Sequence, residues 1–488
     1  MMQQGDTGDV YFIGVDSGSQ STKVSVINQR GEVICSATQP LRPTISRHPG
    51  WVEHPDDDLW DSLKAAMHRL FEVFQGDRKD IAGIGLCSIR CCRVFLKHDG
   101  SLAAPVMSWM DVRAYQTYED SEEIGYAGST SGYLTFRLTG EFKDTIANQH
   151  QYQFPTDLHA WKWSEDPAHF DSFGIPREKL MEMHLPGEIL GRVTPEAAEE
   201  TGLPAGVPVV STANDKAVEA IGSGLVEPDV VLLSLGTYIT SMVFGDTVRP
   251  ETDHVWTNLS NIPFRYLYES VGIRGGMWHI SWFKGVIGED LARRAQEENL
   301  TVEQLLEKDA AAVPAGSDGL LTVPDWLAPA TELFRKGVMI GFDQRHTRGH
   351  IYRSIMEAIT MRMKNNIDRM NADLGVVPRK LIVCGGGSNS DLFMQIVADV
   401  FGVPASRNVV NGAAGLGAAV SAAVATGTYR DFPEAVEHMV HQRDSFSPKP
   451  ENHEVYTRIN GGAYRSLTTM LEPALRTIYA ATSGESGE

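Results

Sequence analysis

The sequence predicts an α/β protein built from two duplicated domains, and three observations support this class. The chain has 488 residues, which corresponds to two large domains or to three of roughly 150 residues each. Hydrophobic residues make up 42% of the chain and charged residues 22%, as is usual for globular proteins with sizeable cores. A hairpin with a polar turn, a long amphipathic helix and a short apolar strand occur twice in the same order. We therefore expect an internal duplication of a βββαβ unit.

The first copy begins with a β-meander. An apolar run is followed by a polar turn from Asp16 to Ser21 and by a segment, TKVSVI, that alternates polar and apolar side chains, which predicts a half-buried strand. Apolar residues three or four apart then predict a helix, and the run IAGIGLCSI predicts a parallel strand that is covered on both faces. The predicted elements are strands at 11–16, 22–27 and 32–37, a helix at 57–74 and a strand at 81–89.

The second copy repeats this order and adds further elements. It reads as a hairpin at 230–244, a helix at 350–370 and a strand at 380–384. A Gly-rich loop then opens a helix within 385–405, and Ser388 or Ser390 is suited to cap that helix. Small residues predict a close-packed helix at 413–427, and the tail from 455 to 481 reads as a final helix. The predicted domains are 1–225, 226–445 and a helical tail at 446–488, with a hinge near 222–230.

Charge and composition exclude several classes of partner. The formal net charge is −20, and such an acidic surface repels nucleic acid and anionic membranes. The chain contains no run of about 18 apolar residues that could span a bilayer. The first ten residues lack the basic start and apolar core of a signal peptide, and the five cysteines form no CxxC pair. We therefore expect a cytoplasmic protein with reduced thiols.

The turns of the two hairpins have the composition of phosphate-binding loops. The first, DSGSQSTK, joins Asp16 to small hydroxyl residues and ends at Lys23. The second places Gly236 and Thr237 after an apolar strand. Small residues and backbone N–H groups can surround a phosphate closely. A polar hairpin tip with one lysine is common by itself, but two such turns on duplicated units can clamp one polyphosphate from both sides.

Two strand ends carry further candidate residues. Asp215 follows an apolar strand at 207–212, where α/β sheets build their sites. It fits either a helix N-cap or a general base for the hydroxyl that attacks phosphorus. Three glycines, 385–387, follow the strand at 380–384. They suit a planar or phosphate ligand at a helix N-terminus, although a tight connection would need only one glycine.

Taken together, these motifs resemble those of the FGGY carbohydrate kinases, within the actin-like ATPase superfamily. The resemblance covers residues 11 to about 440 and rests on several ordered motifs. The matching segments are GVDSGSQSTK (14–23), HPGWVEHPDDDLW (48–60, similar to xylulose kinases), SLGT (234–237), GVMIGFDQRHTRGHIYRSIMEA (337–358), GGGSNSDLFMQIVADVFGVPA (385–405) and AAGLGAA (413–419). The resemblance implies two ribonuclease H-like domains with a central cleft.

The resemblance also implies ATP and Mg²⁺ as cofactors. Asp215 matches the catalytic base of the family, and Asp16 matches the carboxylate near the metal, so that both are expected metal-site residues. The residues expected to bind ATP are Ser19, Thr22 and Lys23 of the first loop, Gly236 and Thr237 of the second, and Gly386, Gly387, Ser388 and Asn389 at the adenosine site. Closure of the cleft would exclude water from ATP.

The acceptor site is expected near two segments of the first domain. SIRC (88–91) is similar to the SMRE of autoinducer kinases, which makes Arg90 a candidate donor, with a surface arginine as the alternative. WMDVR (109–113) resembles the WNDGR of xylulose kinases, so Trp109 and Asp111, with Asp215, are expected to bind substrate. The stretch from Arg113 to Tyr133 is shorter than is usual for the family. This difference could open the pocket, leave one wall to a partner subunit or impair activity.

Two classes of function follow. The first is an ATP-dependent kinase that phosphorylates a hydroxyl of a small sugar, with a ketopentose such as xylulose as the first choice and a polyol, an aldonate or an autoinducer-type acceptor as alternatives. The second is a non-catalytic, actin-like nucleotide switch. A small-molecule sugar is the expected partner in the first class. A homodimer is a further expectation, because symmetric dimers are common.

Overall fold

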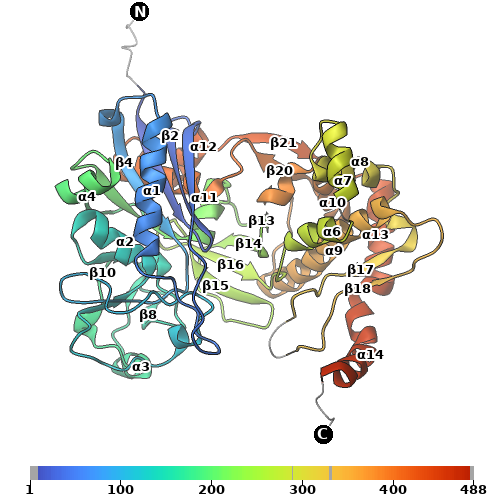
Figure 1. Ribbon diagram of the computed structural model, residues 1–488, viewed down its shortest axis with the longest axis horizontal. Helices are drawn as coiled ribbons and strands as arrows, with labels where there is room; N and C mark the ends of the chain where they lie inside the picture. Colours follow the sequence, from blue (N-terminus) through green and yellow to red (C-terminus); the bar gives the residue numbers. More distant parts are fainter. Residues whose placement is uncertain (1–8, 288, 329–331, 484–488) are drawn as a thin grey trace, which may run out of the picture.

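The computed structural model describes residues 9–287, 289–328 and 332–483, and they form two α/β domains joined side by side (Figure 1). The ends of the predicted first domain and helical tail, 1–8 and 484–488, lie outside the described residues. The first domain is built on a six-stranded sheet of order β11-β12-β4-β1-β2-β3. Its strands are β1 Tyr11–Ser17, β2 Ser21–Asn28, β3 Val33–Pro40, β4 Ile81–Ser88, β11 Ile189–Arg192 and β12 Pro208–Asn214.

The second domain has a seven-stranded sheet of order β15-β16-β14-β13-β19-β20-β21. Its strands are β13 Val230–Leu235, β14 Ile239–Gly245, β15 Val255–Leu259, β16 Tyr266–Ser270, β19 Lys380–Cys384, β20 Ala405–Asn408 and β21 Gln442–Phe446. Each sheet contains an antiparallel hairpin, β1–β2 or β13–β14, whose first strand pairs in parallel with β4 or β19. Beyond β4 or β19, each sheet adds one parallel strand, β12 or β20, and then an antiparallel edge strand, β11 or β21. The predicted duplication is therefore confirmed by the topology.

The helices cover these sheets, and shorter strands and single turns connect them. Those of the first domain are α1 Asp58–Val73, α2 Thr130–Thr139, α3 Pro167–Phe173, α4 Pro195–Thr201 and α5 Asp215–Gly222. Those of the second part of the chain are α6 Trp278–Ile287, α7 Glu289–Glu297, α8 Val302–Ala311, α9 Arg348–Leu374, α10 Asp391–Phe401, α11 Ala413–Ala425, α12 Phe432–Met439, α13 Pro450–Ile459 and α14 Arg465–Ser483. The short strands are β5 Val94–Leu96, β6 Tyr126–Gly128, β7 Lys143–Thr145, β8 Thr156–Asp157, β9 Lys162–Trp163, β10 Glu182–His184, β17 Leu321–Val323 and β18 Val338–Ile340.

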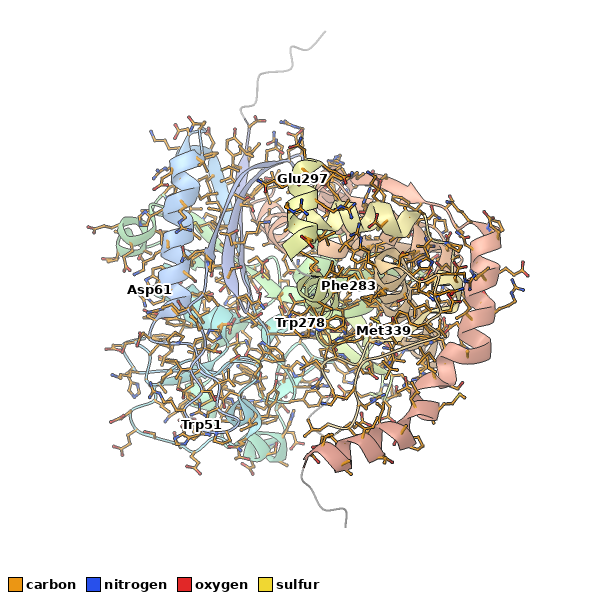
Figure 2. All side chains as sticks on the ribbon, turned by 45° about the vertical axis from the view of Figure 1, so that its right-hand side comes forward. Trp51, Asp61, Trp278, Phe283, Glu297 and Met339 are labelled. Carbon is orange, nitrogen blue, oxygen red and sulfur yellow. The ribbon has the colours of Figure 1, made fainter. Side chains whose placement is uncertain are left out.

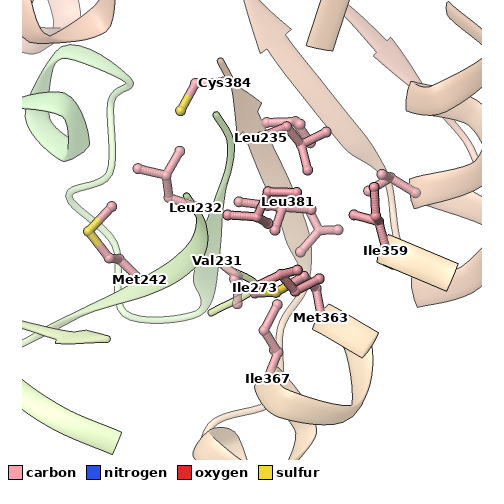
Figure 3. Packing of buried hydrophobic residues seen from close by; sticks show 14 of the residues in the cluster. Val231, Leu232, Leu235, Met242, Ile273, Ile359, Met363, Ile367, Leu381 and Cys384 are labelled. Atoms are coloured by element: carbon pink, nitrogen blue, oxygen red, sulfur yellow. The ribbon is translucent and has the colours of Figure 1, made fainter. Parts of the chain in front are cut away.

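Helix α9 forms much of the second domain's core. Its apolar stripe includes Ile359, Met363 and Ile367, which pack with Val231 and Leu381 of the central strands (Figure 3). The predicted stripe of the 350–370 segment is therefore confirmed. The predicted final helix is found as α13 and α14, joined by one π-helical turn at Asn460–Tyr464. Together they form a long helical run along the outer side of the second domain (Figure 2).

Helix α11 packs on the first domain although it follows the second domain's strands in sequence. It lies against β1, β4 and α5, where small residues let the backbones approach closely. A Cβ atom added at Gly85 would lie 1.9 Å from the carbonyl oxygen of Ala418, and one at Gly14 would lie 1.9 Å from that of Gly415. The small-residue composition of 413–427 therefore serves helix–sheet packing across the two halves of the chain. The division at 225/226 stays a prediction.

We expect Gly85→Ala to destabilise the protein by at least about 1–3 kcal/mol, because the new methyl group has no room beside α11. Gly285→Ala is the matched control, since no atom lies within 4 Å of a Cβ added at that position of α6. Thermal unfolding midpoints would measure both changes. Equal midpoints for the two variants would contradict the packing argument.

Candidate active site

The turn of the β1–β2 hairpin exposes Ser19 and Gln20 to solvent. The Gly18 amide donates a hydrogen bond to the Ser21 carbonyl at 3.0 Å, and Ser19 is exposed. Lys23 lies opposite Asp16 in the hairpin, and its Nζ lies 2.7 Å from where a Cβ of Gly412 would be, at the start of α11. Ser19 is therefore accessible from solvent, and the Lys23 side chain reaches the start of α11.

Thr22 departs from the expectation for the first loop. Its side chain is fully buried, and its hydroxyl shares a hydrogen bond of 2.7 Å with the hydroxyl of Ser62 in α1. The alternation of a β-strand explains this placement, because neighbouring residues face opposite sides of the sheet. The expectation that Thr22 contacts phosphate is therefore corrected: this hydroxyl supports the hairpin from within the first domain.

The second hairpin turn and the Gly-rich loop lie against each other. A Cβ atom at Gly385, whose φ is +82°, would lie 2.6 Å from the Leu235 carbonyl oxygen. A Cβ at Gly276 would lie 2.3 Å from the Gly236 carbonyl oxygen. Glycine is therefore needed at 385 and at 276, because any side chain there would collide with the backbone of the second hairpin turn.

The Gly-rich loop continues into a 3₁₀ turn, Gly386–Asn389, before α10 begins. Ser388 donates its hydroxyl hydrogen to the Gly385 carbonyl at 2.8 Å. The side chain of Ser390 accepts a hydrogen bond from the Phe393 amide, so Ser390, and not Ser388, caps α10. The four residues expected at the adenosine site, Gly386, Gly387, Ser388 and Asn389, thus form one turn beside the second hairpin.

Asp215 occupies the first position of α5, directly after β12. The helix is capped by Asn214, whose side-chain oxygen accepts hydrogen bonds from the amides of Lys216 and Ala217 at 3.2 and 3.1 Å. The N-cap interpretation of Asp215 is therefore wrong. Its Oδ1 is enclosed by protein and has no hydrogen-bond partner within the described residues. A buried carboxylate oxygen without a partner is costly, which indicates a group held ready for a ligand.

Several charged groups surround Asp215. Burial raises the pKa of Asp215 despite the opposing effects of Arg90 and Lys216. Burial, together with the charges of Asp215 and Glu219, raises the pKa of Asp16 to about 6. Asp16 and Asp215 therefore form an electrostatically strained pair of carboxylates at the ends of β1 and β12.

A network that the sequence analysis did not single out joins this pair to the second domain. Lys216 donates to Glu219 at 2.6 Å, and Ser234 of β13 donates to the same carboxylate at 2.8 Å. Burial alone would raise the pKa of Glu219. The charge and hydrogen bond of Lys216, with the hydrogen bonds of Cys384 and Ser234, outweigh burial and hold that pKa below its usual range. The signal was visible as a Lys–Glu pair three residues apart on the helix after Asp215.

The carboxylates present suit a Mg²⁺ ion that keeps part of its hydration shell. Mg²⁺ is commonly held by one or two carboxylates together with substrate phosphates. Asp16 and Asp215 meet that need, because their mutual repulsion, seen in the raised pKa of Asp16, would be relieved by a divalent cation. In the described part of the chain, no group of three or more His, Cys, Asp or Glu side chains is arranged to hold a metal ion unaided.

The pKa of Asp16 predicts a change of stability with pH. A carboxyl group whose pKa is higher in the folded state favours folding below its unfolded pKa of about 4, and this contribution is lost as the pH rises through about 6. We therefore expect Asp16→Asn to be more stable than the wild type above pH 6 without nucleotide or divalent cations. The difference should vanish near pH 4. Urea unfolding from pH 4 to 8 would measure it, and a constant difference would contradict the assignment.

Arg90 forms a buried ion pair between the two domains. Its guanidinium donates to both oxygens of Glu269 in β16, at 2.8 and 2.9 Å, and lies 4.8 Å from the ring centre of Trp256 in β15. Thr240 also donates to Glu269, at 3.0 Å. The surface alternative for Arg90 is therefore wrong. The sequence analysis did not identify Glu269. The signal that could have revealed it is an acidic residue within the mostly apolar strand YLYES.

Trp109 and Asp111 take different places in the structure. Trp109 is about half exposed, whereas Asp111 is completely buried. Asp111 accepts hydrogen bonds from the Val52 amide at 2.8 Å and from the backbone and guanidinium of Arg113. The expectation that Asp111 binds substrate is therefore corrected: its oxygens hold the 109–113 segment against the segment around Val52. Trp109 remains a candidate for contact with substrate.

A narrow polar crevice lies beside Arg90 and Asn214. Its wall includes Asn148, Gln149 and His150, none of which the sequence analysis identified. The side-chain oxygens of Asn148 and Gln149 are buried and have no hydrogen-bond partner within the described residues. Burial and the charge of Arg90 lower the pKa of His150 to about 3, so this imidazole is neutral near pH 7. Neutral donors and acceptors are suited to hydroxyl groups.

Comparison with known families decides the class of the protein. The model of the N-terminal domain of the FGGY family of carbohydrate kinases matches residues 11–129 and 119–222, and that of the C-terminal domain matches residues 231–426. The chain belongs to the FGGY family of carbohydrate kinases. It is therefore an enzyme of the phosphotransferase class that uses an alcohol group as acceptor and acts on a small-molecule sugar.

Relatives of this FGGY kinase support the family assignment over nearly the whole chain. It is 47% identical to the uncharacterized sugar kinase YgcE of Escherichia coli K12, over 98% of this chain and 97% of the relative. It is 25% identical to the xylulose kinase of Bacillus subtilis, over 91% of this chain and 94% of the relative.

Solved structures confirm the fold of the FGGY kinase. The crystal structure of xylulose kinase from Rhodospirillum rubrum matches with a TM-score of 0.80 at 25% identity, over 96% of this chain and 100% of that one. The structure of Plasmodium falciparum glycerol kinase with ADP matches with a TM-score of 0.76 at 17% identity, over 94% and 98%. The expected actin-like ATPase fold is thus confirmed. No helix within the described residues is both long and apolar enough to cross a membrane.

Proposed function

We propose that this kinase transfers the γ-phosphoryl group of ATP to a hydroxyl of a small sugar or sugar derivative, with Asp215 as the general base. The observation that carries the proposal is the buried, unpartnered Oδ1 of Asp215 at the end of β12. Burial raises the pKa of this carboxyl group, which makes the carboxylate a better proton acceptor at neutral pH. The hydroxyl would lose its proton to Asp215 as its oxygen attacks phosphorus.

The two hairpin turns would hold the phosphates of ATP. Ser19 is exposed in the first turn, Lys23 lies opposite Asp16 in the same hairpin, and Gly236 and Thr237 form the second turn. Backbone N–H groups and one lysine supply the positive potential that a polyphosphate requires. Gly386, Gly387, Ser388 and Asn389 would contact the adenosine end, because their turn lies directly beside the second hairpin.

Mg²⁺, when bound, would neutralise charge on the transferring phosphoryl group. Asp16 and Asp215 are the residues that would hold it, directly or through water. The remaining contribution of the chain is positional. Holding the acceptor hydroxyl and ATP in line converts a bimolecular encounter into an oriented one, which can supply a large part of the rate.

A ketopentose such as xylulose is the first choice of acceptor. The HPGWVEH segment and Trp109 support this choice, as do relatives named as xylulose kinases. The Arg90–Glu269 pair and the neutral crevice lined by Asn148, Gln149 and His150 offer several hydrogen-bonding groups to hydroxyls. A polyol, an aldonate or an autoinducer-type acceptor is the alternative, because other relatives are named as glycerol and autoinducer-2 kinases.

ADP release from the purified protein tests the proposal. MgATP would be supplied with a panel of ketopentoses, polyols, aldonates and linear autoinducer-type diols. We expect one acceptor class to give ADP release well above the rate without acceptor, and a phosphorylated product of matching mass. ATP binding without any acceptor-dependent ADP would contradict the proposal and favour the nucleotide switch.

A further inference from the structure

A cavity of about 410 Å³ in the second domain has an unusual concentration of arginines. Arg362 and Arg369 come from α9, Arg274 follows β16, and Arg335 precedes β18. Asn366 of α9 donates a hydrogen bond to the Val271 carbonyl at 2.8 Å, which fixes one wall to another. The residues expected to bind adenosine, 386–389, do not line this cavity.

The arginines exceed their counter-ions. Arg362 lies 3.3 Å from Asp325, and Arg335 lies 3.8 Å from the same carboxylate. Arg335 also pairs with Glu332 at 2.6 Å, outside the cavity wall. Within the described residues, neither Arg274 nor Arg369 lies within 4.0 Å of a carboxylate. Both side chains are exposed, and both line the cavity. Against the four arginines, the acidic residues of the wall are Asp253 and Asp325.

This charge pattern specifies the chemistry of a ligand. Even with Glu332 counted against Arg335, Arg274 and Arg369 remain without a carboxylate within 4.0 Å among the described residues, in a chain whose formal net charge is −20. A phosphate monoester carries a charge of about −1.5 to −2 at pH 7, and planar guanidinium groups bind its oxygens in pairs. A volume within roughly 300–1,000 Å³ is usual for small-molecule sites. We propose that the cavity binds the phosphate group of a small phosphorylated metabolite, at a site separate from that of ATP.

The cavity also adjoins the second hairpin turn. Tyr238 lies in its wall, directly after Thr237, and the Tyr238 hydroxyl accepts a hydrogen bond from the Gly272 amide at 3.2 Å. The cavity and the turn expected to hold ATP are therefore neighbours, since Tyr238 directly follows that turn in sequence. Because the two positions are close, an experiment must fill the nucleotide site before it measures anion binding.

Isothermal titration calorimetry on the full chain, saturated with the magnesium complex of a non-hydrolysable ATP analogue, tests the inference. The probes are inorganic phosphate and ribose 5-phosphate. Ribose is the uncharged comparison, and acetate is the carboxylate comparison. We expect both phosphate probes to bind and the affinity to fall as salt rises. We expect Arg369→Gln and Arg274→Gln each to weaken binding about tenfold or more, the scale of a lost charge-assisted hydrogen bond.

Arg458→Gln is the matched control. Arg458 is an exposed arginine of α13, outside the cavity, and its variant should bind as the wild type does. The inference would be overturned by three results: no phosphate binding by the wild type, binding by the Arg274 and Arg369 variants equal to that of the wild type, or tighter binding of acetate than of either phosphate probe. The measurement needs no turnover, so its outcome is independent of the proposed kinase reaction.

Discussion

Asp215→Asn is expected to lower turnover by at least about 100-fold, the scale of a lost general base, while ATP binding is retained. Asparagine has nearly the same shape as aspartate but cannot take a proton from the acceptor hydroxyl. The residues expected to bind ATP lie in the two hairpin turns and at 386–389, so their geometry should survive the change. The rate of ADP release gives the turnover number, and calorimetry gives the affinity for ATP.

A control and a second readout make this test specific. Asp171→Asn changes an exposed aspartate of α3 and should leave turnover unchanged. Because the charge of Asp215 helps to raise the pKa of Asp16, the Asp215 variant should also show a lower pKa for Asp16. Turnover of the Asp215 variant equal to that of the wild type would remove Asp215 from the role of base.

Arg90→Met is expected to destabilise the protein by about 3–5 kcal/mol, as is found when one partner of a buried ion pair is removed. The side chain of Glu269 is only 1% exposed, so its carboxylate would lose its counter-ion without gaining water. The pair joins the β4–β5 connection of the first domain to β16 of the second. The free energy of the first unfolding transition in urea measures the effect.

The double variant Arg90→Met with Glu269→Gln should recover most of the lost stability. The neutral amide removes the buried charge and can still accept the hydrogen bond from Thr240. Arg30→Met is the matched control, because Arg30 forms ion pairs with Asp9 and Glu32 at the exposed surface, and such pairs contribute about 0–1 kcal/mol. An Arg90 effect no larger than that of Arg30 would show that the interdomain pair adds no stability.

The sequence by itself determined the duplicated framework of this protein and the order of its main elements. Apolar runs and helical spacing predicted β4, α9 and β19 within a few residues, because these patterns record which faces of a segment are buried. The duplicated hairpins with polar turns indicated the two-domain architecture. The ordered motifs, in particular GVDSGSQSTK, SLGT and the triple glycine, gave the family. These features are local patterns of neighbouring residues, so they can be recognised in the sequence without knowledge of the fold.

Only the tertiary structure decided how distant residues are paired. Asn214, and not Asp215, caps α5, and Thr22 faces Ser62 instead of the open turn. Asp111 accepts hydrogen bonds from Val52 and Arg113, and Arg90 forms an ion pair with Glu269 of the second domain. The contacts of Thr22 with Ser62, of Asp111 with Val52 and of Arg90 with Glu269 join segments that are far apart in sequence, whereas the Asn214 cap of α5 is local. No local spacing encodes a contact between distant segments, because its free energy arises only when both partners leave water together.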